Sequence, residues 1–396
     1  MNIVFYSNIF FTDCDFSLIR EFQQKGIRIT YYIQVISGRQ CGGLLDLRSY
    51  NLSPGIYQAS IFSEFKKFEK FLNLSNVYIV WKSSHLSDFS NWITYFKLFK
   101  AIKKENPTVV HIAGELGLSE FLLYFFRKKM VQTVHDPLMH SGEKNWLSEI
   151  RRNFSFKLAS KLVLLNENQK RDFMERYGVP KNKVFSNRLG VYEALNCIFA
   201  NCNSNFEYPQ KYVLFFGHIS QYKGIDTLCN AMLKVHSVVP DLTCVIAGKG
   251  DLYFNFEPFK KYDFIRLENR FISSEELSWL IEKSLFVICP YKDATQSGVV
   301  SSAFAMLKPV LATNVGGLGE SVLDEVTGRL VPPNNPDLLA LTICDMVKNK
   351  SKLTNYSNNI KNIFWSGNKS WSSIADKFFE IYENKNGNID KNAFKI

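Results

Sequence analysis

The stretch "LFVICPYKDATQSGVVSSAFAMLKPVLAT", residues 285–313, decides the fold of the chain around it. An apolar run closed by Pro290 predicts a buried strand, and the apolar face that follows Gly298 predicts a helix. A second apolar run over 309–313 predicts the next strand. Ser297 and Gly298 therefore stand where a strand passes into a helix, a position at which backbone N–H groups bind anions.

Strand and helix alternate in the same way in both directions along the chain. The apolar runs "NIVFYS", "IRITYYIQV", "TVVHIAG" and "MVQTVHD" predict strands in the first half, and "YVLFFGH", "LTCVIAGKG" and "GRLVPP" predict strands in the second. "LSEFLLYFFRKK" is among the predicted helices between them. Apolar strands separated by helices are typical of parallel sheets covered on both faces. We therefore predict an α/β protein of two doubly wound, Rossmann-like domains that face each other across a cleft.

The domain boundaries follow from breaks in this alternation. We predict a first domain over 1–193, an Asn-rich linker over 194–211 and a second domain over 212–370. A helix over 371–386 is expected to cross back to the first domain, followed by a polar tail over 387–396.

Composition limits the class of protein. The chain has 396 residues, 46% of them hydrophobic and 21% charged, which is typical of a soluble protein with two domains. It contains no apolar run of about 18 residues, and its first residues lack the features of a signal peptide. Its eight cysteines form no C-x-x-C pair and its six histidines are scattered, so we expect free thiols, a cytoplasmic location and no metal site.

The net charge of +11 favours phosphate-rich partners. No nucleic-acid-binding motif is present, which leaves a diphosphate ligand or an anionic membrane. Basic and aromatic residues alternate in "FKKFEKFL", "FKLFKAIKK" and "FLLYFFRKKM". Such stretches are typical either of a surface that rests on a bilayer or of ordinary solvated helix faces.

Glycines and polar residues follow several predicted strands of the second half. In an open parallel sheet these strand ends bind ligands, and their repetition predicts a phosphate-bearing ligand. The candidate residues by this criterion are Gly217, His218, Lys223, Gly248, Gly250, the run Thr295 to Val300, Gly316, Gly317 and Glu320.

The ordered set of motifs resembles a known family. "YVLFFGHISQYKGIDTLCNAM", "LTCVIAGKGD", "NRFISSEELSWLIEKSLFVICPY", "ATQSGVV" and "PVLATNVGGLGESVLDEVTGRLVPPN" are similar to the donor domain of family 4 glycosyltransferases, of GT-B fold. "PTVVHIAG", "VQTVHDPLMHSGE" and "SWSSIADKFFEIYE" extend the likeness over residues 105–384, whereas 1–104 agree only in pattern. The resemblance implies transfer of a sugar from a nucleotide-diphosphate donor with retained configuration and no metal or cofactor. The acceptor would be a glycan, lipid-linked on this reading, in surface polysaccharide synthesis at the inner face of the plasma membrane.

The resemblance also assigns roles to residues. Lys223 would be the main cation on the departing diphosphate, with His218 where the family most often has arginine. His135 would bond the donor sugar or the reacting hydroxyl. The other donor-side residues would be Gly217, Gly248, Arg270, Phe271, Ile272, Thr295, Gln296, Ser297, Gly298, Val299 and Val300; those on the acceptor side would be Asp136, His140, Glu143 and Glu115.

Some residues depart from the family pattern or allow a second interpretation. Most relatives carry two glutamates eight positions apart where this chain has Thr295 and Ala303, and "ATQSG" is similar to a subgroup that lacks the pair. A turn capped by Ser273 or Ser274 explains residues 270–272 equally well. His111 is also consistent with a packed strand end.

Asp13-Cys14-Asp15 matches the D-x-D pattern of metal-dependent transferases, but Asp15 is also a candidate N-cap of the first helix. Two alternative functions stay open at this point. One is a non-catalytic glycosyltransferase-like partner subunit, and the other is a different GT-B enzyme such as a sugar-nucleotide epimerase.

Overall fold

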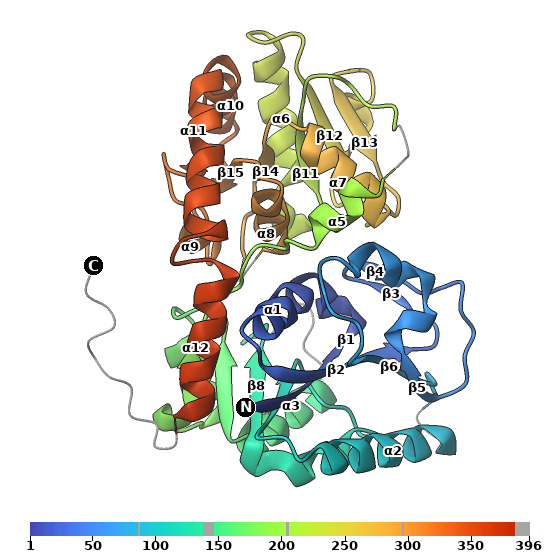
Figure 1. Ribbon diagram of the computed structural model, residues 1–396. Helices are drawn as coiled ribbons and strands as arrows, with labels where there is room; N and C mark the ends of the chain where they lie inside the picture. The colour runs from blue at the N-terminus through green and yellow to red at the C-terminus, as the bar shows by residue number, and fades with distance from the viewer. Residues whose placement is uncertain (86–87, 138–145, 203–205, 295–296, 385–396) are drawn as a thin grey trace. The chain divides into compact units, whose positions relative to one another are not determined.

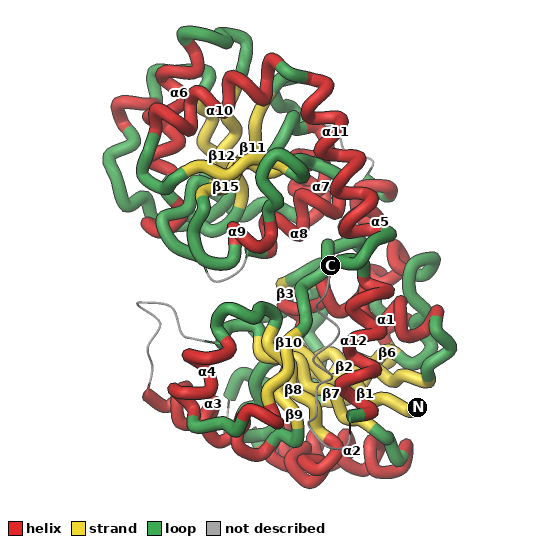
Figure 2. Tube along the Cα trace, turned by 90° about the vertical axis from the view of Figure 1, so that its left-hand side faces the viewer, coloured by secondary structure: helices red, strands yellow, loops and turns green. Residues whose placement is uncertain are grey.

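The computed structural model describes residues 1–85, 88–137, 146–202, 206–294 and 297–384. The chain divides into two compact units, each with a parallel sheet between layers of helices (Figures 1 and 2). Unit 1 comprises residues 1–189 together with the segment from 371 onward, and unit 2 comprises residues 190–370.

Unit 1 contains an eight-stranded sheet in the order β10-β9-β8-β7-β1-β2-β6-β5. All neighbours pair in parallel except β5, which is antiparallel to β6. Six neighbouring strands of this sheet, β6-β2-β1-β7-β8-β9, are parallel. Numbered by their order along the chain, they follow the order 3-2-1-4-5-6 of a dinucleotide-binding sheet. The strands are β1 (Asn2–Asn8), β2 (Arg28–Ile36), β5 (Gly55–Gln58), β6 (Val77–Lys82), β7 (Val109–Ala113), β8 (Met130–Val134), β9 (Lys161–Leu164) and β10 (Val184–Ser186), with a small hairpin of β3 (Cys41–Gly42) and β4 (Leu45–Asp46).

Unit 2 contains a six-stranded, wholly parallel sheet in the order β13-β12-β11-β14-β15-β16. This is again the order 3-2-1-4-5-6, and the chain reverses its direction of travel across the sheet between β11 and β14. The strands are β11 (Tyr212–Phe216), β12 (Thr243–Ala247), β13 (Ile265–Glu268), β14 (Val287–Cys289), β15 (Val310–Thr313) and β16 (Gly328–Val331).

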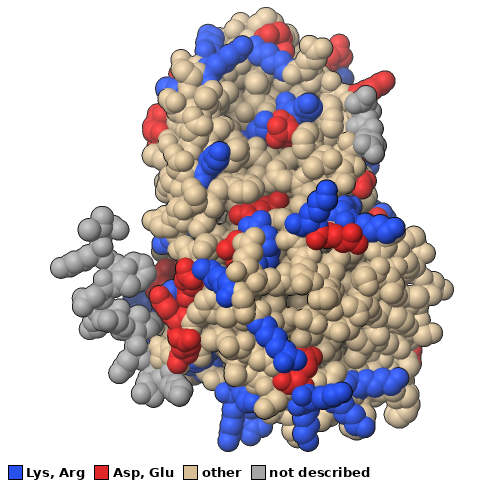
Figure 3. All heavy atoms as spheres, in the orientation of Figure 1, with Lys and Arg blue, Asp and Glu red and all other residues tan. Residues whose placement is uncertain are grey.

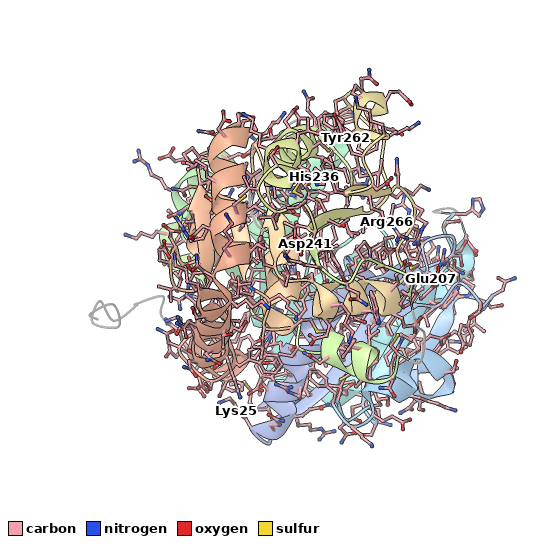
Figure 4. The ribbon with its side chains drawn as sticks, turned by 90° about the horizontal axis from the view of Figure 1, so that it is seen from above. Lys25, Glu207, His236, Asp241, Tyr262 and Arg266 are labelled. Carbon is pink, nitrogen blue, oxygen red and sulfur yellow. The ribbon has the colours of Figure 1, made fainter. Side chains whose placement is uncertain are left out.

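The helices of unit 1 include the last helix of the chain. That helix, α12, packs against α1, and Lys25 at the end of α1 (labelled in Figure 4) forms an ion pair with Asp376 at 2.7 Å. The helices are α1 (Thr12–Gln24), α2 (Phe89–Glu105), α3 (Trp146–Leu158), α4 (Lys170–Tyr177) and α12 (Trp371–Glu383).

The helices of unit 2 begin before its sheet. Residues 194–211 are predicted from the sequence to form a linker. They instead contain the helix α5, which packs against α7. Arg266 of β13 also donates to the carbonyl of Glu207 at 2.8 Å and so holds this segment to the sheet edge (Figure 4). The helices are α5 (Leu195–Ala200), α6 (Ile225–His236), α7 (Ser274–Lys283), α8 (Gly298–Ala305), α9 (Leu318–Ser321), α10 (Pro336–Lys348) and α11 (Lys350–Ile360).

Two local expectations need correction. Residues Phe121–Lys129 form the 3-10 helix η4 in place of the expected α-helix, and its three-residue repeat puts Leu123 and Phe126 in one inward row against the core. Asp15 is not an N-cap. It lies inside α1, whose N-cap is Phe11, and its buried carboxylate accepts a hydrogen bond from the hydroxyl of Tyr31 at 3.0 Å.

Among the described residues, no helix combines the length and the apolar character that crossing a membrane requires.

Candidate functional site

The strand ends of unit 2 converge because glycines allow their loops to touch. A Cβ on Gly248, after β12, would lie 1.9 Å from the carbonyl oxygen of Gly217, after β11. A Cβ on Gly224 would lie 1.9 Å from the carbonyl oxygen of Pro290, after β14. Only residues without a side chain permit these approaches. The loops after β11, β12 and β14 therefore form one surface at the reversal point of the sheet, where doubly wound folds bind ligands.

Lys223 is a buried cation on this surface. It ends a short 3-10 turn after β11 and is only 8% exposed. Its Nζ donates to the hydroxyl of Tyr291 at 2.7 Å and lies 4.0 Å from the centre of the same ring. Among the described residues, no carboxylate lies within ion-pair distance of this ammonium.

Burial lowers the pKa of Lys223 to about 8, because the charged form loses its hydration. A buried ammonium is stabilised most by a partner that carries negative charge. Lys223 is a buried ammonium whose hydrogen bond goes to a neutral hydroxyl, and its contact with an anionic ligand therefore stays a prediction.

The start of α8 supplies the second part of the site. Ser297 is buried and extended, directly before the helix, and its side chain lies beside the hydroxyl of Tyr291. Burial raises the pKa of Tyr291 well above its ordinary value, and the neighbouring Ser297 acts in the opposite direction. Ser297 and Lys223 thus lie at the same phenol. The N–H groups of the first turn of α8 add a positive dipole end beside them.

Gly298 and Val299, in the first turn of α8, lie close to residues of other segments of unit 2. A Cβ on Gly298 would lie 3.0 Å from the hydroxyl of Tyr192, and a Cβ on Gly217 would lie 3.7 Å from a methyl group of Val299. Val300 is buried in the same helix. These positions belong to the same surface as Lys223, whereas Thr295 and Gln296 lie outside the described residues.

The remaining donor-side candidates occupy the rim of the sheet. His218 is exposed and makes no hydrogen bond with a described residue. Arg270 is held by Glu276 through two hydrogen bonds of 2.6 and 2.8 Å, and by Glu268 at 3.0 Å. Its charge is therefore already paired within the protein. Phe271 is exposed and Ile272 is half-buried, directly before the cap of α7.

The predicted serine cap of α7 is present. Ser273 is the N-cap, and its side chain accepts from the backbone N–H of Glu276 at 3.1 Å. The turn over residues 270–273 thus has a complete structural explanation. Contact of this turn with a nucleotide base stays a prediction.

Unit 1 places three groups at or next to its own reversal point, which lies between β1 and β7. Phe11 follows β1, Gly114 follows β7 and His135 follows β8. The rings of Phe11 and His135 stack with centres 3.8 Å apart and an interplanar angle of 7°. A Cβ on Gly114 would lie 2.9 Å from the ring of Phe11.

His135 is a neutral imidazole in this setting. Burial lowers its pKa to about 4, so the ring carries no charge at neutral pH. Its Nε2 is buried and has no hydrogen-bond partner among the described residues. A neutral ring with a vacant nitrogen is able to exchange a hydrogen bond with a bound hydroxyl.

Glu115 and Asp136 are joined by one arginine. Arg152 of α3 forms an ion pair with Glu115 at 2.8 Å, and its guanidinium also donates to the carbonyl of Asp136. Burial raises the pKa of Glu115. Arg152 therefore holds the loops after β7 and β8 together, while His140 and Glu143 lie outside the described residues.

His111 has a structural role, as its alternative interpretation predicted. It is fully buried, and its two ring nitrogens contact the hydroxyls of Tyr382 and Thr133. Burial lowers its pKa to about 3, so it stays neutral while it joins α12 to β7 and β8.

The described residues contain no group of three or more potential metal ligands. Within the D-x-D sequence, burial raises the pKa of Asp13 and of Asp15 to about 7, which opposes the charged form that a metal requires. Sequence reasoning missed Tyr291, Phe11 and Arg152. For Tyr291 a signal was present, since it directly follows the apolar run of β14, where strand ends carry ligands.

Two family models match the chain. Residues 16–191 match the model described as Glycosyltransferase Family 4, and residues 210–349 match the model described as Glycosyl transferases group 1. Together these matches span most of the chain, one in each unit.

Curated relatives carry the same class of name. The chain is 31% identical over 173 residues to an uncharacterised glycosyltransferase of Methanocaldococcus jannaschii, a match that covers 43% of this chain and 47% of the relative. The chain spans about half the length of the curated relatives that head this comparison.

Solved structures share the fold. A complex of Anabaena HepE with UDP-glucose has a TM-score of 0.61 at 15% identity, over 96% of this chain and 99% of that one. The UDP-GlcNAc 2-epimerase of Neisseria meningitidis, bound to UDP-GlcNAc, has a TM-score of 0.54 at 14% identity, over 96% and 99%. The two Rossmann-like units and these likenesses confirm the predicted GT-B fold. At such identity they concern the fold alone.

Proposed function

Because this chain belongs to the family 4 glycosyltransferases, we propose that it transfers a sugar from a nucleotide-diphosphate donor to a glycan acceptor. The donor would bind to unit 2 and the acceptor to unit 1. The observation that carries this proposal is the buried ammonium of Lys223, which has no carboxylate partner among the described residues.

The chemistry follows from where charge develops in the reaction. When the bond between the sugar and the diphosphate breaks, the leaving oxygen gains negative charge. Lys223 would neutralise part of this charge, while Ser297 Oγ and the first N–H groups of α8 donate hydrogen bonds to the phosphate. These groups would stabilise the leaving diphosphate without a metal ion, and no cofactor is needed.

On the acceptor side, His135 would bond a hydroxyl of the donor sugar or the hydroxyl that attacks it. Its neutral imidazole suits this role at physiological pH. We further propose that configuration is retained and that the acceptor is carried on lipid for surface polysaccharide synthesis at the inner face of the plasma membrane. The family resemblance supports the retained configuration and the role in surface polysaccharide synthesis. The basic and aromatic stretches of unit 1 support the lipid carrier.

An epimerase is the second candidate, because epimerases occur among the structures of the same fold. It is less favoured because both family models that match are glycosyltransferase models. A non-catalytic partner subunit is disfavoured by Lys223, since burial of an unpaired ammonium reduces stability unless a ligand uses it.

The experiment uses the full chain with a panel of nucleotide sugars and a lipid extract as acceptor. We expect release of nucleoside diphosphate together with transfer of labelled sugar to the lipid fraction. Conversion of the sugar nucleotide to an epimer without transfer would support the epimerase, and the absence of binding to any donor would support the partner subunit.

The variant Lys223→Met tests directly whether the buried ammonium supports the reaction. It should lower kcat/KM for the donor by about 10²–10³-fold, the usual effect of removing a group that stabilises developing charge. Lys350→Met, an exposed lysine on α11, is the matched control and should leave the rate unchanged. Equal rates for the two variants would reject the role of Lys223.

A further inference from the structure

Helix α2 has two apolar faces, of which one is buried in the core and the other is largely exposed. The inward face contains Tyr95, Leu98 and Ile102, which are fully buried in the core of unit 1. The outward face presents large apolar side chains at the i, i+3, i+4 and i+7 positions of a helix, and Phe89 at its start is 73% exposed. The residues of the outward face are Phe89, Trp92, Ile93 and Phe96.

Two neighbouring elements extend the outward face of α2. Phe121 of η4 packs its ring against Trp92 with centres 5.6 Å apart, and Phe125 of η4 is 68% exposed. Tyr124 of η4 contacts Phe154 of α3 with ring centres 5.5 Å apart, and Trp146 at the start of α3 is 70% exposed. We call the joined surface the aromatic face: Phe89, Trp92, Ile93, Phe96, Leu118, Phe121, Phe125, Trp146, Ile150 and Phe154.

The aromatic face is bordered by positive charge. Figure 3 shows Lys and Arg side chains gathered along the lower edge of unit 1, over α2. The Nζ of Lys100 lies 4.4 Å from the ring centre of Phe96, so charge and aromatic surface are in direct contact. The exposed basic residues of these three elements are Lys97, Lys100, Lys103, Lys104, Arg127, Lys128, Lys129, Arg151 and Lys157.

Acidic residues on or beside the same elements are engaged with the protein. Asp88, the N-cap of α2, accepts from the backbone N–H of Ser90 at 3.0 Å. Glu105 accepts from the hydroxyls of Thr30 and Tyr32 at 2.6 and 2.8 Å. Glu120, directly before η4, is buried and forms an ion pair with Lys82 at 2.8 Å. Glu149 of α3 forms an ion pair with Arg176 at 2.7 Å. The charge presented beside the aromatic face is therefore strongly positive.

We propose that the aromatic face of unit 1 lies on the surface of a bilayer that contains anionic lipid. Tryptophan and phenylalanine insert at the level of the headgroups, and lysine and arginine beside them bind the lipid phosphates. The face lies on the membrane and does not span it, in keeping with the helix lengths. A second copy of the chain fits less well, because a two-fold contact would bring the lysines of α2 close to their own copies.

This inference rests on the proposed function in one respect, since it explains how the protein reaches an acceptor carried on lipid. The test separates the two. Binding to vesicles is measured without any sugar donor, and release of nucleoside diphosphate from the donor is measured without vesicles.

The experiment is flotation of the full chain with vesicles of 70% phosphatidylcholine and 30% phosphatidylglycerol, against vesicles of phosphatidylcholine alone. We expect binding to the anionic vesicles that weakens when NaCl rises from 0.1 to 0.5 M. Trp92→Ser/Phe96→Ser should lower the partition coefficient at least tenfold, and Lys97→Gln/Lys100→Gln/Lys104→Gln should weaken both the binding and its salt dependence. Leu341→Ser and Lys348→Gln/Lys350→Gln, at exposed positions of unit 2, are matched controls and should bind as wild type.

Three results would overturn the proposal: no binding of wild type to the anionic vesicles, unchanged binding of Trp92→Ser/Phe96→Ser, or an equal loss in the controls. If light scattering shows a dimer that becomes a monomer in Trp92→Ser/Phe96→Ser, the face belongs to a second copy and the proposal is also wrong. Circular dichroism confirms that each variant is folded, and unchanged release of nucleoside diphosphate confirms that its donor site is intact.

Discussion

At the scale of single residues, Lys223 has the property that most directly controls activity. Its ammonium loses its proton near pH 8, well below the usual range for lysine, because burial removes its hydration. In the free protein the positive charge is therefore complete below this pH and decreases above it. The binding of a diphosphate depends on that charge.

We predict that kcat/KM for the donor decreases above about pH 8, by about tenfold per pH unit, because this ratio reports the protonation of the free enzyme. Lys223→Arg, which keeps its charge, should shift the decrease to higher pH even if its absolute rate is lower. A pH–rate profile from 6 to 10 measures both. A wild-type profile that is flat to pH 10, or the same decrease in Lys223→Arg, would contradict the assignment.

At the scale of elements, the donor surface depends on the contact between the loops after β11 and β14. Gly224 has a φ of +66° at the junction between Lys223 and α6, and it touches the carbonyl of Pro290. Gly178 after α4 has a similar φ of +59°, but a Cβ there would meet nothing within 4 Å. The two glycines share a backbone conformation and differ in crowding.

Replacement of each glycine by alanine separates these two effects. Gly178→Ala should cost only the strain of a left-handed residue, about 1–2 kcal/mol. Gly224→Ala must also move one loop, so we expect a larger loss of unfolding free energy and a fall in affinity for nucleoside diphosphate. Urea denaturation and calorimetric titration measure these losses, and equal losses at both positions would show that the contact has no special importance.

At the scale of the whole molecule, the last described helix belongs to the unit in which the chain begins. The buried face of α12 includes Ile374, Phe378 and Tyr382. Phe378 and Tyr382 pack beside Phe22 of α1 and His111 of β7. Unit 1 is therefore complete only after the chain has passed through unit 2.

We predict that Phe378→Ala destabilises unit 1 by about 3–5 kcal/mol, the usual cost of deleting a buried phenylalanine. Hydrogen exchange should show the loss in β1 and β7 and leave the sheet of unit 2 protected as before. Glu380→Ala, on the exposed side of α12, is the control and should change stability by less than about 0.5 kcal/mol. Loss of protection in unit 2 would contradict the independence of the two sheets.

The sequence by itself determined the alternation of strands and helices, because the spacing of apolar residues is a local property of the chain. It also indicated Lys223, Ser297 and Gly298, because strand ends in parallel sheets carry ligands. It could not indicate that Tyr291 supports Lys223 or that Phe11 stacks on His135, since the partners in each pair come from separate strands.

Only the tertiary structure decided these pairings, because the order of strands in a sheet brings together residues that are distant along the chain. It likewise decided the charge states of Lys223 and His135, since these depend on burial and not on residue type. It also showed which apolar residues of α2 face water, because both faces of that helix have the same spacing in the sequence.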